Sequence, residues 1–243
     1  MKKLLLIFIG LAVSISAWAQ TPRVDSVALM ILNHMSDIIG DLNSCSFKLQ
    51  TSVDVIDYDF GTIKQTGTDE VSMVGPDKML VHSYGDKGHQ GYWYNGEQVA
   101  YYSFSENNYA TVEAQPDILS TIDSLNMNYN IDFPAADFFY PTFTDDILSQ
   151  YPNILFAGIK NVAGQECFHV IVSNQQQTIQ FWIANNAYSL PEKFVITYKN
   201  HENMQYEATF SDWKLNPEIP EAVFEFLPPP NANRITLLPV TTK

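Results

Sequence analysis

The sequence predicts an α+β fold in which a curved antiparallel sheet carries helices on one side. Segments with the period-two alternation typical of strands form two long runs, one ending at Phe104 and one beginning at Asn153. Helical patterns occur only at the start of the mature chain and between these runs. Strands and helices therefore do not alternate along the chain, which excludes the doubly wound parallel sheets of βαβ proteins.

The first residues have the pattern of a cleavable signal peptide. Lys2 and Lys3 form a positive start, an apolar run extends to Ile15, and the tripeptide Ala17-Trp18-Ala19 supplies the small residues that precede a cleavage point. The alternative is a membrane anchor, but a spanning helix needs about 20 apolar residues and this run is shorter. We therefore expect a signal peptide over residues 1–19 that is cleaved after Ala19.

The mature chain, residues 20–243, is expected to form a single acidic domain. The whole sequence has a formal net charge of −14, and removal of Lys2 and Lys3 makes it −16. Such a field repels phosphate backbones, so nucleic-acid binding is disfavoured. No Cys follows the cleavage point for lipid attachment, and no transmembrane segment is expected in the mature chain. The expected location is the periplasm, with the extracellular space as the alternative.

An amphipathic helix is expected first, with Thr21 as its cap, Pro22 in its first turn and Gly40 at its end. Its apolar stripe consists of Val24, Val27, Ala28, Ile31, Met35 and Ile38. Strands are then expected at residues 47–55, 62–73, 78–84, 91–94 and 98–104. The last two flank Asn95-Gly96, a dipeptide that favours a tight type I′ hairpin.

The middle of the chain is expected to be helical. Pro116 and Asp117 open a helix, and two short helical pieces are expected at residues 134–140 and 145–150. The sheet then resumes. The second run of strands is expected at residues 153–160, 165–173, 178–184, 193–199 and 204–215, with a short last strand at Phe224 and Phe226.

Six phrases, taken in order, resemble one protein family. These are residues 92–96 (YWYNG), 164–169 (GQECFH), 179–183 (IQFWI), 190–198 (LPEKFVITY), 205–213 (QYEATFSDW) and 224–229 (FEFLPP). The chain is similar in these phrases to a family of predicted periplasmic proteins of unknown function (DUF2092-like). That family resembles the lipoprotein-carrier superfamily typified by LolA and LolB.

The resemblance covers nearly the whole mature chain. It implies an incomplete β-barrel of about eleven antiparallel strands, with helices as a lid over an apolar concave face. It implies no known activity, because a fold does not fix a function. LolB-like proteins are lipid-anchored, and the absence of the required Cys makes the soluble LolA-like form the closer comparison. No functional residue is carried over from these proteins.

Alternating apolar residues in the second run of strands are the main functional candidates. They are either ordinary core or, in part, the wall of a cavity for a lipid or acyl chain. Two aromatic residues near the predicted hairpin are further candidates for the same wall. The candidate ligand-binding residues are Trp93, Tyr101, Phe181, Ile183, Phe194, Ile196, Tyr206 and Phe210.

The middle helix is the candidate lid. Its apolar stripe consists of Ile118, Ile122, Leu125 and Tyr129. A curved sheet with aromatic side chains on its concave face needs cover, and this helix is short and amphipathic. We therefore expect it to lie over the candidate ligand-binding residues and to expose a cavity when it moves.

Cys45 and Cys167 are the only cysteines of the chain, and an exported chain with two is a candidate for a disulfide. Two buried thiols are the alternative. If the bridge forms, the two Cα atoms should lie within about 7 Å of each other.

No motif indicates catalysis or a cofactor. The five histidines show no spacing typical of a zinc site, and the chain has no nucleophile elbow, phosphate loop or dinucleotide fingerprint. We therefore expect no metal, no cofactor and no enzymatic activity. Two functions remain. One is a periplasmic carrier or sensor for a lipid, an acyl chain or the acyl group of a lipoprotein, and the other is a cell-envelope interaction module with a filled core and a protein partner.

Overall fold

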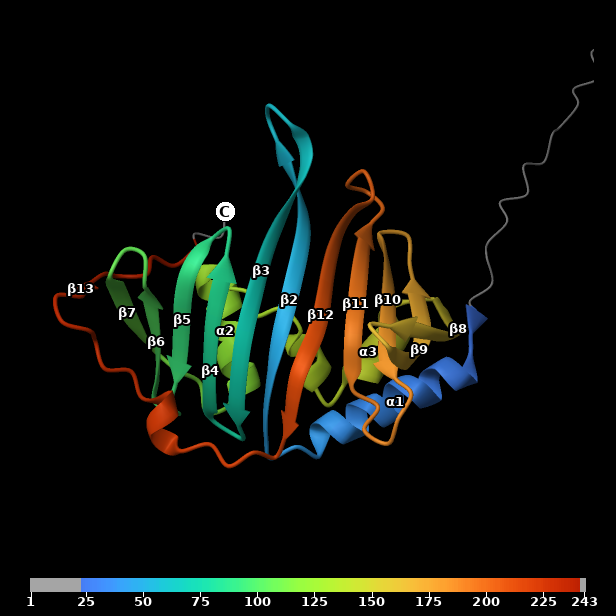
Figure 1. The fold of residues 1–243 in the computed structure, drawn as a ribbon, viewed down its shortest axis with the longest axis horizontal. Helices are drawn as coiled ribbons and strands as arrows, with labels where there is room; N and C mark the ends of the chain where they lie inside the picture. Colours follow the sequence, from blue (N-terminus) through green and yellow to red (C-terminus); the bar gives the residue numbers. More distant parts are fainter. Residues whose placement is uncertain (1–22, 241–243) are drawn as a thin grey trace, which may run out of the picture.

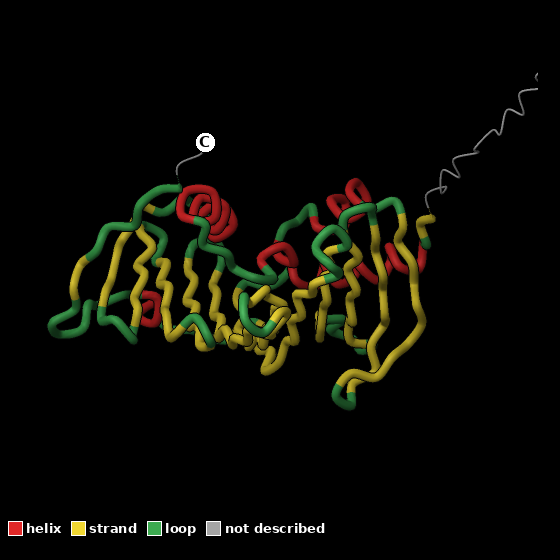
Figure 2. The backbone as a smooth tube through the Cα atoms, turned by 90° about the horizontal axis from the view of Figure 1, so that it is seen from above, coloured by secondary structure: helices red, strands yellow, loops and turns green. Residues whose placement is uncertain are grey.

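The computed structural model describes residues 23–240, so the predicted signal peptide at 1–19 lies outside the described residues. The described chain forms one open, curved sheet of 13 strands with all three α-helices on its concave side (Figures 1 and 2). The sheet does not close into a barrel. The order of the strands is β1-β8-β9-β10-β11-β12-β2-β3-β4-β5-β6-β7-β13.

Eleven long strands, β2 to β12, pair antiparallel with their neighbours. The first run comprises β2 (Ser44–Asp57), β3 (Gly61–Val74), β4 (Lys78–Gly85), β5 (Gly88–Tyr94), β6 (Gln98–Ser103) and β7 (Asn108–Glu113). The second run comprises β8 (Asn153–Val162), β9 (Gln165–Ser173), β10 (Gln177–Ala184), β11 (Pro191–Tyr198) and β12 (Met204–Leu215). The two runs join where β12 pairs with β2.

Two short parallel strands, β1 (Arg23–Val24) and β13 (Asn233–Arg234), add to the edges at β8 and β7. The helices are α1 (Ser26–Gly40), α2 (Ile118–Tyr129) and α3 (Phe143–Gln150), with short 3₁₀ turns η1 (Ala136–Phe139) and η2 (Glu221–Phe224). The sequence patterns place ten of the eleven long strands and all three helices. They miss β7, and they predict a last strand at Phe224 where the structure has η2 instead.

The first helix begins later than the sequence pattern predicts. Arg23 and Val24 are extended and pair with β8, so Asp25 is the cap of α1 and its Oδ1 accepts a hydrogen bond of 2.8 Å from the Val27 backbone N–H. The pairing with β8 joins segments far apart in the sequence, and a local pattern carries no information about such a contact. The expected cap, Thr21, lies outside the described residues.

The hairpin at Asn95 forms, but its turn is not the predicted type I′. Only Gly96 has a positive φ, whereas a type I′ turn requires a positive φ at both central residues. The Asn95 side chain accepts hydrogen bonds of 3.1 Å from the backbone N–H groups of Glu97 and Gln98. This side-chain turn takes the place of the tighter backbone turn.

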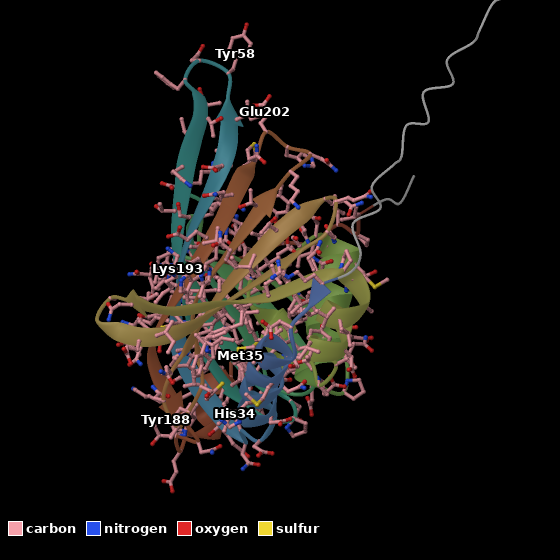
Figure 3. The ribbon with its side chains drawn as sticks, turned by 90° about the vertical axis from the view of Figure 1, so that its right-hand side faces the viewer. His34, Met35, Tyr58, Tyr188, Lys193 and Glu202 are labelled. Carbon is pink, nitrogen blue, oxygen red and sulfur yellow. The ribbon has the colours of Figure 1, made fainter. Side chains whose placement is uncertain are left out.

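Strand register sorts side chains onto the two faces of the sheet. Residues with odd numbers in β2 and β3 lie on the concave face, as do residues with even numbers in β12 up to Phe210, before the bulge that shifts its register. Beyond the body of the sheet, the β2–β3 hairpin projects as an isolated arm (Figure 1). Tyr58 stands at the tip of this arm, farther out than Glu202 in the loop between β11 and β12 (Figure 3).

The helices divide the concave face into two halves. α1, η1 and α3 pack over the half formed by the second run of strands, and α2 packs over the half formed by β4 to β7 (Figures 1 and 2). Under the first group lies the main core, in which Phe138 of η1 contacts the rings of Phe181, Phe194 and Phe210 at centroid distances of 5.9, 5.3 and 5.6 Å.

Candidate ligand-binding cavity

A cavity of about 560 Å³ lies on the concave face between the two groups of helices. Its floor is formed by the central strands β2 to β5, and its sides are formed by α2 and by residues 130–136 and Phe139. We call residues 130–139 the lid segment. Because neither helix group covers the middle strands completely, the cavity occupies the space that remains between them.

Strand register explains why most of this floor is apolar. Val71 of β3 is opposite Val81 of β4, which is opposite Tyr92 of β5, and all three side chains line the cavity. Val53 of β2 adds to the wall beside Tyr206 of β12, its partner in register. The period-two alternation of the first run of strands therefore makes the floor mostly apolar.

A second cleft, of about 740 Å³, lies on the other side of the lid segment. Four of the candidate ligand-binding residues, Phe181, Phe194, Ile196 and Tyr206, line this second cleft. Tyr206 also lines the first cavity. Residues 132–136 border both spaces, so the lid segment is the wall that separates the cavity from the second cleft.

Ile183 and Phe210 line neither space. Ile183 is 0% exposed and Phe210 is 2% exposed, and both belong to the packed core. Phe210 is surrounded by the rings of Phe47, Phe138 and Trp213. The apolar alternation correctly predicts that these two residues face inward, but the part of the concave face where they lie is filled with other side chains.

The structure separates Trp93 from Tyr101. Tyr101 is opposite Tyr92 in register and lies on the concave face, with its ring centroid 5.4 Å from that of Tyr92. Trp93 lies on the convex face, where its ring packs at 5.0 Å against Phe226. The prediction of Trp93 as part of the ligand-binding wall is therefore wrong.

The predicted lid helix forms, but it covers another surface than expected. Ile118 and Ile122 of α2 line the first cavity, and Ile122 also reaches the second cleft. Leu125 and Tyr129 instead face β7 and the C-terminal segment around Arg234. The rings that cover the candidate residues of the second run come from η1 and α3, which correspond to the two short helical pieces that the sequence predicts.

Most residues of the first cavity are not among the candidates that the sequence predicts. These include Thr51, Val53, Asp69, Val71, Val81, Ser83 and Tyr92. The signal that could have found them is the same alternation in the first run of strands, which is as regular as that of the second run. The order of the strands in the sheet, however, is needed to show that this surface is central and only partly covered.

A polar group interrupts the apolar floor. Asp69 of β3 accepts a hydrogen bond from the Oγ–H of Ser83, its partner in register on β4. Burial raises the pKa of the Asp69 carboxyl, while the Ser83 hydrogen bond and the positive charge of Lys87 act against this rise. Burial also raises the pKa of the hydroxyls of Tyr92 and Tyr206, and the Asp69 charge raises both further.

The raised pKa of Asp69 predicts a pH-dependent effect of Asp69→Asn. When the pKa of a carboxyl is higher in the folded than in the unfolded protein, the folded protein becomes less stable as pH rises above the unfolded pKa of about 3.9. The asparagine variant cannot ionise, so its melting temperature relative to wild type should rise between about pH 3.5 and pH 7. Thermal denaturation of delipidated protein measures this difference, and Asp59→Asn at the tip of the arm controls for the lost charge. A difference that stays constant with pH would contradict the prediction.

The cysteines do not form the candidate bridge; they are the two buried thiols that the sequence leaves open as the alternative. Cys45 lies in β2 and Cys167 in β9, and both are free, buried thiols. Strands β12, β11 and β10 lie between them, which corresponds to roughly 19 Å at the usual strand spacing. Burial raises the pKa of Cys45 to about 12 and that of Cys167 to about 11. The sequence could not decide between the two alternatives, because two strand starts can lie far apart in one sheet.

Within residues 23–240, no helix has both the length and the apolar character needed to cross a membrane. In the same part of the chain, no group of three or more His, Cys, Asp or Glu side chains is arranged to hold a metal ion.

Comparison with solved structures finds several similar chains, and the first of them shares the fold. An uncharacterized conserved protein from Thermus thermophilus superposes with a TM-score of 0.51 at 11% identity, over 86% of this chain and 99% of its own. LprF from Mycobacterium bovis gives a TM-score of 0.49 at 11% identity, with coverages of 82% and 97%. A LolA superfamily protein from Nitrosomonas europaea gives 0.36 at 10% identity, with coverages of 82% and 97%.

No curated protein is significantly similar in sequence. The family described as predicted periplasmic protein (DUF2092) matches residues 28–238, which include every strand of the chain from β2 to β13. The family resemblance of the sequence phrases is thereby confirmed. The open, curved sheet with helices on its concave side also agrees with the fold class that the sequence predicts. This chain belongs to the DUF2092 family of predicted periplasmic proteins.

Proposed function

We propose that this protein is a carrier or sensor that holds an apolar ligand in the cavity of its concave face and performs no catalysis. The ligand is a lipid, an acyl chain or the acyl group of a lipoprotein. The protein acts in the periplasm after removal of the signal peptide. The observation that supports this function best is the cavity over β2 to β5, because its floor is mostly apolar and two small elements, α2 and the lid segment, cover only its sides.

The size and chemistry of the cavity suit such a ligand. Ligand sites usually have volumes of about 300–1,000 Å³ and mostly apolar walls, and this cavity has about 560 Å³. Each CH₂ group that moves from water into the cavity contributes about 0.8 kcal/mol. A chain of several CH₂ groups therefore supplies the free energy of binding without any charged contact.

The lid segment is proposed as the gate. It contains two residues with left-handed backbone conformations, Asn130 with φ 54° and Ala135 with φ 71°. Such residues mark sharp changes of chain direction, where a small change of dihedral angles swings the residues between them. Because residues 132–136 border both the cavity and the second cleft, their displacement would join the two spaces into one longer site for an acyl chain.

The second candidate function is an interaction module of the cell envelope. The arm formed by β2 and β3 favours it, because its tip presents apolar side chains away from the sheet (Figure 3). Tyr58 is 99% exposed and Phe60 is 80% exposed, and Ile56 next to them is also exposed. In this function the arm contacts another envelope protein and the concave face needs no ligand.

Lipid extraction from protein purified out of its native envelope tests the carrier function. Mass spectrometry should find one lipid class at close to one molecule per protein, since an apolar cavity exchanges water for an acyl chain favourably. An unrelated periplasmic protein purified by the same steps controls for carry-over. The delipidated protein should then raise the fluorescence of N-phenyl-1-naphthylamine on binding it. If neither lipid nor the fluorescent compound is bound, the interaction module replaces the carrier.

A further inference from the structure

A row of polar side chains crosses the apolar floor of the cavity. Asp69 of β3, Ser83 of β4 and Gln90 of β5 are partners in register on the concave face, and all three line the cavity. In each of these strands, the next concave residue toward the core is apolar or aromatic: Val71, Val81 and Tyr92. Packing of the sheet does not require polar side chains in this row, because the neighbouring row on the same face, Val71, Val81 and Tyr92, is formed by apolar and aromatic side chains.

The carboxylate in this row has only a neutral partner. Asp69 accepts a hydrogen bond from Ser83, and in residues 23–240 no lysine, arginine or histidine forms an ion pair with it. A half-buried carboxylate is stabilised by further hydrogen-bond donors, since it can accept several at once. Donors on a bound molecule can supply these hydrogen bonds.

The opposite wall offers an unused hydroxyl. The Tyr206 hydroxyl is buried and has no hydrogen-bond partner among the described residues. Tyr206 of β12 and Asp69 of β3 line the same cavity. The pKa of the Tyr206 hydroxyl is raised by burial and then by the charge of Asp69. By contrast, the Tyr92 hydroxyl on β5 already donates to Gln90 Oε1 at 3.2 Å. A buried hydroxyl without a partner lowers stability until a ligand pairs with it.

We propose that the cavity selects apolar molecules that carry a hydroxyl head group, with Asp69 accepting the hydrogen bond of that hydroxyl and Tyr206 donating to its oxygen. This inference rests on the proposed function. A hydroxyl is the group that matches both partners, because it donates and accepts at once. An ammonium group matches Asp69 alone. A carboxylate or phosphate is repelled by Asp69 and by the negative charge of the protein as a whole.

Three ligands with one chain length test the head group. Decan-1-ol, decylamine and decanoate compete with N-phenyl-1-naphthylamine for delipidated protein at about pH 7.5, where decanoate is ionised. Decanol should bind more tightly than decanoate by about tenfold or more, since each good hydrogen bond changes affinity about fivefold to tenfold. Asp69→Asn should remove most of this preference by strengthening decanoate binding.

Tyr206→Phe tests the second partner of the hydroxyl. This variant keeps the aromatic ring and removes a hydroxyl that has no partner, so its melting temperature should equal or exceed that of wild type. Its affinity for decanol should fall about fivefold to tenfold, while its affinity for decylamine stays unchanged. Tyr198→Phe, whose ring lines the second cleft, is the matched control and should leave both affinities unchanged.

The outcomes separate the inference from the proposed function. If the three ligands bind equally well, or if Tyr206→Phe keeps full affinity for decanol, the head-group selection is wrong and the carrier function stands. If Tyr198→Phe lowers the affinity in place of Tyr206→Phe, the ligand occupies the second cleft and the inference is also wrong. If neither the fluorescent compound nor any decyl ligand binds wild-type protein, both the inference and the proposed function are overturned.

Discussion

Replacement of Phe210 by alanine is expected to lower the free energy of unfolding by about 3–5 kcal/mol, the usual cost of removing a buried phenylalanine ring. Phe210 is 2% exposed, and its ring lies 5.5 Å from that of Phe47 and 5.4 Å from that of Trp213. The surrounding rings belong to β2, β12 and η1, so collapse of the space would require movement of three elements. Urea denaturation followed by circular dichroism measures the change.

The matched control for this substitution is Phe60→Ala. Phe60 is 80% exposed at the tip of the arm, and substitutions at such positions usually change stability by no more than about 0.5 kcal/mol. A loss below about 1 kcal/mol in Phe210→Ala would mean that the core under η1 is not packed as described. Phe210 lies in this core and not in the cavity, so a loss of ligand affinity in Phe210→Ala would reflect the loss of stability. The sequence pattern suggests Phe210 as a probe of ligand binding, but the structure makes it unsuitable for that purpose.

Val53→Trp is expected to weaken ligand binding strongly while the protein stays folded. Val53 is half-buried in the cavity wall beside Tyr206, and an indole ring at this place extends into the cavity. Insertion of a larger side chain into a packed core typically costs about 1–3 kcal/mol, but here the added atoms enter open space. We expect roughly tenfold or weaker binding of N-phenyl-1-naphthylamine and of decanol, measured by fluorescence titration.

Ser52→Trp is the control for Val53→Trp. Ser52 is the preceding residue of β2, and its side chain lies on the convex face of the same strand. The Ser52→Trp variant carries its new indole ring on the convex face, outside the cavity, so its ligand affinity should equal that of wild type. Unchanged affinity in Val53→Trp, with the fold intact by circular dichroism, would contradict the assignment of the binding site. The two variants together distinguish occlusion from a general effect of the new ring.

The two predictions show how far the sequence pattern reaches. Alternation along β10, β11 and β12 correctly identifies Phe181, Phe194 and Phe210 as inward-facing residues. It cannot show which of them faces a filled interior and which faces an open cleft. That difference depends on where η1 and α3 lie, and tertiary contacts alone place these elements over the sheet.

Trp93 and the cysteines illustrate the same limit. Tyr92, Trp93 and Tyr94 are consecutive aromatic residues, so they show no alternation that would assign a face. The pairing of Tyr92 with Tyr101 makes the assignment and places Trp93 on the convex side. Cys45 and Cys167 each lie near the start of a strand, but three strands lie between β2 and β9 in the sheet. Neither result follows from local spacing.

The sequence by itself determined the type and the approximate place of most elements, because hydrophobic periodicity is a local property of each segment. It also determined the membership of the family, through phrases distributed over the chain. The tertiary structure alone decided that β12 pairs with β2, that α2 and the lid segment divide the concave face, and that Asp69 and Tyr206 face one cavity. These features depend on contacts between segments that are distant in the sequence. Periodicity cannot reveal such contacts, because the hydrophobic pattern of a segment is the same whichever strand or helix it packs against.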